Sequence, residues 1–131
     1  MNISVAADTN LRLYIDGAHV LYHMGWHSSS TVADISSCLL AVKAYNGGGN
    51  SGILLSTSGG DIISDATWKC SSEVEADWMT LCFDDSHWNE AVVSVANGNP
   101  PWGLFADIRA DAMWMWSDKM IGYTYCRKRF C

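Results

Sequence analysis

Residues 4–20 read SVAADTNLRLYIDGAHV, and this stretch decides the fold. An apolar run reaches Asp8, apolar and polar residues then alternate from Leu11 to Asp16, and Asp16-Gly17 precedes a second run, AHVLYHM. Alternation with a period of two predicts a half-buried β-strand, and an Asp-Gly pair between two such runs predicts a hairpin. The stretch therefore predicts an antiparallel hairpin with Asp8 at its mouth, where a carboxylate is costly to bury.

The rest of the chain repeats this pattern of short strands and turns. Apolar or alternating segments that predict strands lie at residues 37–45, 53–58, 61–64, 90–96, 112–117 and 122–130. Glycine-rich turns such as NGGGNSG separate them, and the two prolines stand together in NGNPPWG. Helical periodicity is weak, and the best candidate for a helical turn is SHWNEAV, residues 86–92. Short strands with such turns predict an all-β antiparallel sandwich or barrel.

The overall composition favours one domain, residues 1–131, with a substantial apolar core. The net charge is −6, and the Lys and Arg residues are scattered apart from the group at 127–129, which argues against nucleic acid as a partner. No apolar run is long enough to cross a membrane, so no membrane insertion is expected. The first ten residues do not resemble a signal peptide, so a secreted protein would require an added Met1 or a longer parent chain.

The five cysteines indicate an oxidising compartment. They are Cys38, Cys70, Cys82, Cys126 and Cys131, and none of them forms a C-x-x-C motif. We interpret them as disulfide cysteines of a secreted, extracellular protein, with one thiol left over. Cys126 and Cys131 are too far apart to bridge directly on an extended strand, so one of them is expected to reach Cys38. The other would then be free or intermolecular, which offers one route to a homo-oligomer.

Four segments together carry a family resemblance. They read AADTNLRLYIDGAHV (6–20), LLAVKAYNGGGNSGILL (39–55), SDATWKCS (64–71) and FDDSHWNEA (83–91). In this order they resemble the motifs of galactose-binding-like jelly-roll domains, which occur as accessory modules of α-L-rhamnosidases and in secreted animal proteins. The resemblance implies a jelly-roll β-sandwich and is much less specific for a ligand.

The last segment, AMWMWSDKMIGYTYCRKRF (112–130), resembles strands that usually open these domains. The chain is therefore either one permuted repeat of a longer chain with tandem-repeat neighbours, or a domain whose last strands take the first position. In both cases the two ends are expected to meet in one sheet.

The resemblance also implies a calcium-assisted sugar site. In the rhamnose-binding relatives an acid and an amide of the A-D-N motif, with an Asn after the next strand, hold calcium beside the sugar. The matching positions are Asp8 and Asn46, while Thr9 replaces the amide. Asn10, one position later, is expected to supply an oxygen to the ligand together with Asp8 and Asn46. Carboxylate and amide oxygens suit calcium. The alternative is that Asp8 caps a turn and Asn46 starts the glycine turn.

The tryptophans are the second set of candidate site residues. By resemblance Trp68 and Trp88 belong to the core, and Trp114 and Trp116 are expected to share the packed face of one strand. Trp26, next to His27, and Trp102 fall in predicted loops. An exposed indole there can stack on a sugar ring, and the alternative is that it plugs the end of the barrel.

No catalytic constellation is evident. Asp84 and Asp85 are adjacent, so their side chains point apart on an extended chain and do not face each other as glycosidase acids do. The histidines lack zinc-site spacing, and no G-x-S-x-G elbow is present. Cys70 and Cys82 flank an excursion between two of the resembling segments, which favours a local bridge between them. We expect a lectin and not an enzyme, and the alternative is an extracellular structural or adhesive matrix module without a small ligand.

Overall fold

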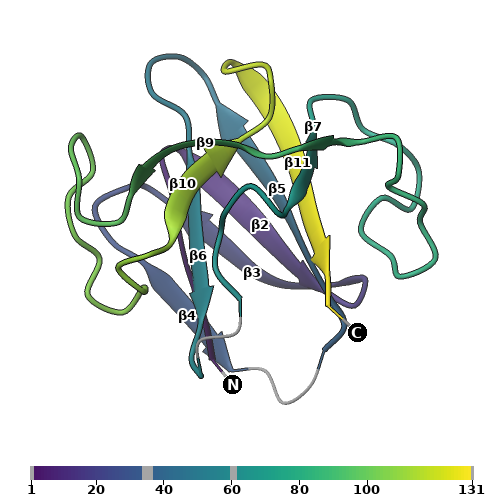
Figure 1. Cartoon of the computed structure of the whole chain (residues 1–131), viewed down its shortest axis with the longest axis horizontal. Helices are drawn as coiled ribbons and strands as arrows, with labels where there is room; N and C mark the ends of the chain where they lie inside the picture. The colour runs from purple at the N-terminus through teal and green to yellow at the C-terminus, as the bar shows by residue number, and fades with distance from the viewer. Residues whose placement is uncertain (1, 34–36, 60–61, 131) are drawn as a thin grey trace.

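The computed structural model describes residues 2–33, 37–59 and 62–130, which form two antiparallel β-sheets (Figure 1). The strands are β1 (Asn2–Ala7), β2 (Asn10–Ile15), β3 (Ala18–Met24), β4 (Ser30–Ala33), β5 (Leu39–Asn46), β6 (Ile53–Thr57), β7 (Lys69–Ser71), β8 (Asn89–Glu90), β9 (Val92–Ala96), β10 (Met113–Trp116) and β11 (Gly122–Arg129). One sheet has the order β4-β1-β6-β10-β9, and the other has the order β3-β2-β5-β11-β7-β8. No described segment is a helix able to cross a membrane. The prediction of an all-β antiparallel sandwich is confirmed.

The predicted hairpin is formed by β2 and β3. Asp16 and Gly17 have φ angles of 48° and 91°, the left-handed region that a tight hairpin turn requires. The Asp16 carboxylate also accepts 2.8 Å hydrogen bonds from the backbone amides of Cys38 and Leu39, where β5 begins. One residue therefore shapes the turn and fastens it to the next strand of the same sheet.

The main core lies between the two sheets. Alternate residues of the central strands point inward, as the period of two predicts, and they are fully buried. The cluster includes Ile3, Val5, Leu11, Leu13, Leu40, Val42, Ile53, Leu55, Trp68, Met115, Trp116 and Cys126. Each large aliphatic side chain buried in this way contributes about 1.5–3 kcal/mol to stability, so this cluster dominates the folding free energy.

Two long connections cover the outer faces of the sheets. Residues 97–112 pack on the five-stranded sheet, where Phe105 and Ile108 join Trp114 in a second apolar cluster. Residues 72–88 pack on the six-stranded sheet, where Trp78 and Trp88 cover Tyr125. Figure 1 shows these connections projecting at opposite sides of the sandwich.

The prediction that four of the tryptophans are buried is confirmed, but the prediction that Trp114 and Trp116 share one face of a strand is wrong. Trp68, Trp88, Trp114 and Trp116 are all buried. Trp114 lies in the outer cluster of the five-stranded sheet, however, while Trp116 lies in the main core. The adjacent residues Met115 and Trp116 both belong to the main core, so the simple alternation that placed both indoles on one face fails after Met115.

Two strand predictions also need correction. The predicted strand 90–96 is divided between β8 in the six-stranded sheet and β9 in the five-stranded sheet. The change of sheet occurs at Ala91, whose amide donates to the carbonyl of Trp68. In the predicted strand 61–64, the described part forms an isolated bridge between Ile63 and Ser56, and Asp61 lies outside the described residues.

The expectation that both ends share one sheet is wrong. β1 belongs to the five-stranded sheet and β11 to the six-stranded sheet, although both termini lie at the same end of the sandwich (Figure 1). The C-terminal segment is split by the connection at 117–121, so that β10 pairs with β6 and β11 pairs with β5. The segment 112–130, which is continuous in sequence, therefore contributes one strand to each of the two sheets.

The disulfide Cys70–Cys126 joins β7 to β11, and the predicted bridge between Cys70 and Cys82 is wrong. Cys70 and Cys126 are cross-strand partners with their Cα atoms 4.1 Å apart, whereas Cys82 is exposed and free. Cys38 is disulfide-bonded as well. The expectations for Cys131 lie outside the described residues.

Candidate functional site

The candidate site is the end of the sandwich opposite the N-terminus, which we call the loop end. It consists of residues 8–9, 25–27, 46–52, 102 and 117–121. The Asp8 amide donates to the Gly52 carbonyl at 3.1 Å, and the Gly25 amide donates to the Thr9 carbonyl at 2.8 Å, so adjacent turns are tied together. Figure 1 shows the β5–β6 and β10–β11 connections side by side at this end.

Asp8 occupies the centre of the turn between β1 and β2, where the chain leaves the core. Its side chain is half-buried, and one carboxylate oxygen accepts a 2.7 Å hydrogen bond from Nε1 of Trp102. No other hydrogen bond from a described residue reaches this carboxylate. Asp8 is therefore oriented by an indole while its second oxygen keeps its full acceptor capacity.

Trp102 is held from the other side by stacking. Its ring lies 4.1 Å from the ring of Trp114 with an interplanar angle of 19°. A Cβ atom on Gly52 would stand 2.5 Å from Cε3 of Trp114 and 3.4 Å from Cζ2 of Trp102, so this position requires glycine. Trp102 is half-buried, which makes it mainly a plug whose indole N–H serves Asp8. The structure thus joins two predicted site residues that are 94 positions apart.

Asn46 fastens loops and is fully buried. Its Nδ2 atom donates to the carbonyls of Met120, at 2.6 Å, and of Gly49, at 3.3 Å. Its Oδ1 atom accepts a 3.3 Å bond from the amide of Gly48. This is the turn-forming role that was the alternative for Asn46, and no hydrogen bond or ion pair joins Asn46 to Asp8.

Trp26 and His27 lie at the side of the loop end. Trp26 follows Gly25, whose amide is bonded to Thr9 of the neighbouring turn. The Trp26 side chain is 38% exposed, and its ring lies 4.1 Å from the His27 ring. Trp26 is the more accessible of the two predicted loop indoles, and no described contact links it to Asp8.

The predicted site residue Asn10 faces elsewhere. The alternation of β2 places it on the outer face of the six-stranded sheet, together with Arg12. It lines a hollow of about 210 Å³ whose other walls are Arg12, Tyr22, Lys43 and Tyr123. The departure from the A-D-N motif therefore moves this amide from the loop end to a neighbouring surface.

The donors present at the loop end define what metal could be held. Among the described residues there is no group of three or more His, Cys, Asp or Glu side chains suited to a metal ion. Calcium takes six to eight oxygen ligands and accepts backbone carbonyls as well as carboxylates. Asp8 supplies a carboxylate oxygen, while the carbonyls of Gly49 and Gly52 accept hydrogen bonds from Asn46 Nδ2 and from the Asp8 amide. A calcium ion held here would need most of its oxygen ligands from water or a bound molecule.

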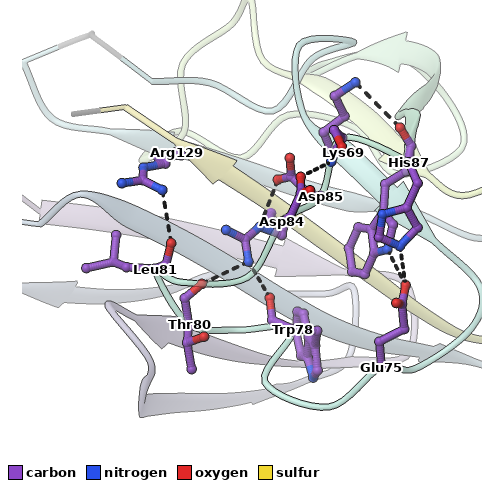
Figure 2. A network of polar contacts seen from close by, with 12 residues as sticks. Lys69, Glu75, Trp78, Thr80, Leu81, Asp84, Asp85, His87 and Arg129 are labelled. Carbon is purple, nitrogen blue, oxygen red and sulfur yellow. Dashed lines mark hydrogen bonds and ion pairs between the residues drawn. The ribbon is translucent and has the colours of Figure 1, made fainter.

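The acidic pair Asp84-Asp85 has a structural role (Figure 2). Asp85 accepts a 2.9 Å bond from Nε of Arg127, a guanidinium that is 1% exposed and also donates to the carbonyls of Trp78 and Thr80. Burial lowers the pKa of Arg127, and the charge of Asp85 opposes that change. Asp84 accepts from the Ser86 amide, and this bond lowers the pKa of the Asp84 carboxyl. Asp85 fastens residues 72–88 to β11, while Asp84 forms a turn within that connection.

Sequence reasoning missed the residues that organise the two long connections. Asn97 is buried; its Nδ2 donates to the carbonyls of Phe105 and Ile108 at 2.9 Å, and its Oδ1 accepts from the Phe105 amide. Arg127 has the same function on the other sheet. The available signal was a polar residue in or directly after an otherwise apolar strand, but no neighbouring residue identified its hydrogen-bond partners.

Comparison with known proteins gives two solved structures with the same fold. A lectin from Pleurotus ostreatus, in its apo form, matches with a TM-score of 0.66 and 27% identity, over 83% of this chain and 35% of the lectin chain. An α-L-rhamnosidase from Streptomyces avermitilis, solved with L-rhamnose, matches with a TM-score of 0.66 and 20% identity, over 96% of this chain and 20% of the enzyme.

The chain therefore spans about a third or less of the length of these two proteins. No protein-family model and no curated protein sequence matches it. The fold is a galactose-binding-like β-sandwich that resembles a rhamnosidase module. This follows from the two packed antiparallel sheets, from the hairpin that begins after Asp8, and from the two structural likenesses.

Proposed function

We propose that the loop end binds a carbohydrate, and that the protein is a lectin or a sugar-binding module of a larger extracellular protein. The observation that carries this proposal is the contact between Asp8 and Trp102. It leaves an oriented carboxylate oxygen at a loop surface that also carries an accessible indole, Trp26. The structural likeness to a lectin supports the same conclusion.

Recognition would combine polar and apolar contacts. The second oxygen of Asp8 accepts hydroxyl hydrogen bonds, and the Trp26 ring offers an apolar surface for the C–H face of a sugar. A calcium ion, held by Asp8 and carbonyls of the glycine turn after Asn46, would supply further coordination for vicinal hydroxyls. Sites of this kind bind weakly when single, so useful affinity would come from oligomers or tandem repeats.

A matrix module without a ligand is the second candidate, and a specific observation favours it. Asn46 is buried and all of its hydrogen-bonding groups are used within the loops, while Trp102 is stacked and half-buried. The remaining oxygen of Asp8 and the exposure of Trp26 favour the lectin over this alternative.

We propose a binding protein and not an enzyme, because Asp84 and Asp85 are engaged in packing the connection at 72–88. Secretion is part of the same proposal. A buried disulfide between two strands is the type of bond that persists in an oxidising compartment.

The test is a glycan array on the purified protein, with calcium and again with a chelator. We expect binding that Asp8→Asn weakens at least about tenfold, because the variant loses the charged acceptor but keeps an oxygen for Trp102. Glu90→Gln is the matched control, since it removes a carboxylate from an exposed position on β8.

The outcomes separate the parts of the proposal. Loss of binding in chelator would support calcium at the loop end, whereas binding that survives would keep the lectin and remove the metal. No binding in a multivalent format would overturn the lectin and leave the matrix module.

A further inference from the structure

The outer face of the six-stranded sheet carries a second site that is independent of the loop end. The hollow of about 210 Å³ is lined by Asn10 and Arg12 of β2, Tyr22 of β3, Lys43 of β5 and Tyr123 of β11. Arg12 stands opposite both Tyr22 and Lys43 in the strand registers, so four adjacent strands build one continuous surface. Strands of a packed sheet hold these side chains more rigidly than a loop would.

The charges in this hollow are unbalanced. Arg12 and Lys43 are cross-strand neighbours, an arrangement of like charges that is normally destabilising. Neither side chain forms an ion pair or donates a hydrogen bond to a described residue. The chain has a net charge of −6, yet no carboxylate lines this hollow.

Two tyrosine rings hold the cations in place. Cζ of Arg12 lies 4.6 Å from the centroid of the Tyr22 ring, and Nζ of Lys43 lies 4.8 Å from that of Tyr123. Cation–π contacts of this length orient a charged group without using its N–H donors. The donors therefore stay free for an anion, while the phenol hydroxyls and the amide of Asn10 offer neutral hydrogen bonds beside them.

We propose that this hollow binds one acidic saccharide unit, a sugar ring that carries a carboxylate or a sulfate. The anion would lie between Arg12 and Lys43, and the ring hydroxyls would meet Asn10 and the tyrosine hydroxyls. The volume is below the roughly 300–1,000 Å³ of pockets for drug-sized ligands, which suits a single ring. Two cations are too few for a nucleic-acid surface, whose binding needs several phosphate contacts.

The probes are glucuronic acid, a sulfated monosaccharide, neutral glucose and inorganic sulfate, each titrated into the whole protein and followed by NMR chemical shifts. We expect the two acidic sugars to bind and to shift residues of β2, β5 and β11, with glucose bound at least about tenfold more weakly. Affinity should fall as salt is raised, because exposed charges are screened. Sulfate binding as tightly as the sugars would overturn the saccharide and leave a simple anion site.

Variants separate this site from the loop end. Arg12→Gln and Lys43→Gln should each weaken glucuronate binding about tenfold with unchanged melting temperature, whereas Arg129→Gln, the same charge change at the far end of β11, should leave it unchanged. Asp8→Asn should also leave glucuronate binding unchanged. Loss of glucuronate binding in Asp8→Asn would overturn the second site and place the acidic sugar at the loop end. No effect of Arg12→Gln and Lys43→Gln would overturn the second site without testing the loop end.

Discussion

At the scale of single residues, a few buried polar side chains decide where the long connections lie. Arg127 is the clearest case, because its guanidinium is buried and has three acceptors: the carboxylate of Asp85 and the carbonyls of Trp78 and Thr80. Burying a cation is costly unless it is fully paired, so these bonds fix residues 72–88 in one position. The same hydrogen bonds hold Trp78 in the aromatic cluster that covers part of the outer face of the six-stranded sheet.

We therefore expect Arg127→Met to lower the free energy of unfolding by about 3 kcal/mol, because a partly buried carboxylate and two carbonyls lose their donor. Urea unfolding followed by tryptophan fluorescence measures this. Arg129→Met is the control, since Arg129 is exposed and donates to the Leu81 carbonyl, and its cost should stay below about 1 kcal/mol. Equal effects of the two variants would contradict the role given to Arg127.

At the scale of strands, the disulfide between β7 and β11 fixes a short strand to a long one. β7 has three residues, and it carries β8 on its free side. Cys70 and Cys126 are 56 positions apart, so the bridge closes a long loop of the unfolded chain. A cross-link of this length stabilises mainly by restricting the unfolded state.

Replacing both Cys70 and Cys126 by Ala should lower the free energy of unfolding by about 2–4 kcal/mol, and the loss should be concentrated at the β7–β8 edge. Chemical denaturation gives the total, and amide hydrogen exchange of β7 against β5 gives the local effect. Cys82→Ala should be close to neutral, because this thiol is exposed and free. If amide exchange in the double variant rose equally in all strands of the six-stranded sheet, the result would argue against a disulfide that mainly holds the β7–β8 edge.

At the scale of the whole molecule, stability should depend on acidic pH through the connection at 72–88. Glu75 accepts 2.8 Å hydrogen bonds from Nε1 of Trp88 and from Nε2 of His87, and these bonds lower the pKa of Glu75 below its ordinary 4.5. A carboxyl whose pKa is lower in the folded state contributes stability above its unfolded pKa. This contribution is lost as the pH falls from about 4.5 through the folded value.

The expected result is a melting temperature that declines below about pH 5, with a shallower decline in Glu75→Gln. Glu73→Gln should keep the slope of the unmodified protein, since no described residue donates a hydrogen bond to the Glu73 carboxylate. Calorimetry gives the melting temperatures of the three proteins between about pH 3 and pH 6, the range in which ordinary carboxyl groups titrate. Parallel curves for Glu75→Gln and the unmodified protein would contradict the assignment.

The sequence by itself determined the fold class, the β2–β3 hairpin and most central strands. These follow from local rules: side chains alternate with a period of two, and Asp16-Gly17 accepts the left-handed angles of a hairpin turn. Such information lies within a few neighbouring residues. It also indicated Asp8 as an acid at a turn mouth that the core cannot bury.

Tertiary structure alone decided the pairing of Cys70 with Cys126, the change of sheet at Ala91, and the partner of Asp8. It also placed Asn10 beside Arg12 and Lys43 instead of at the loop end. Each of these depends on the register between strands that are distant along the chain. A register is fixed by the packing of the whole core, since a slip of one residue reverses every side chain, and no short segment carries that information.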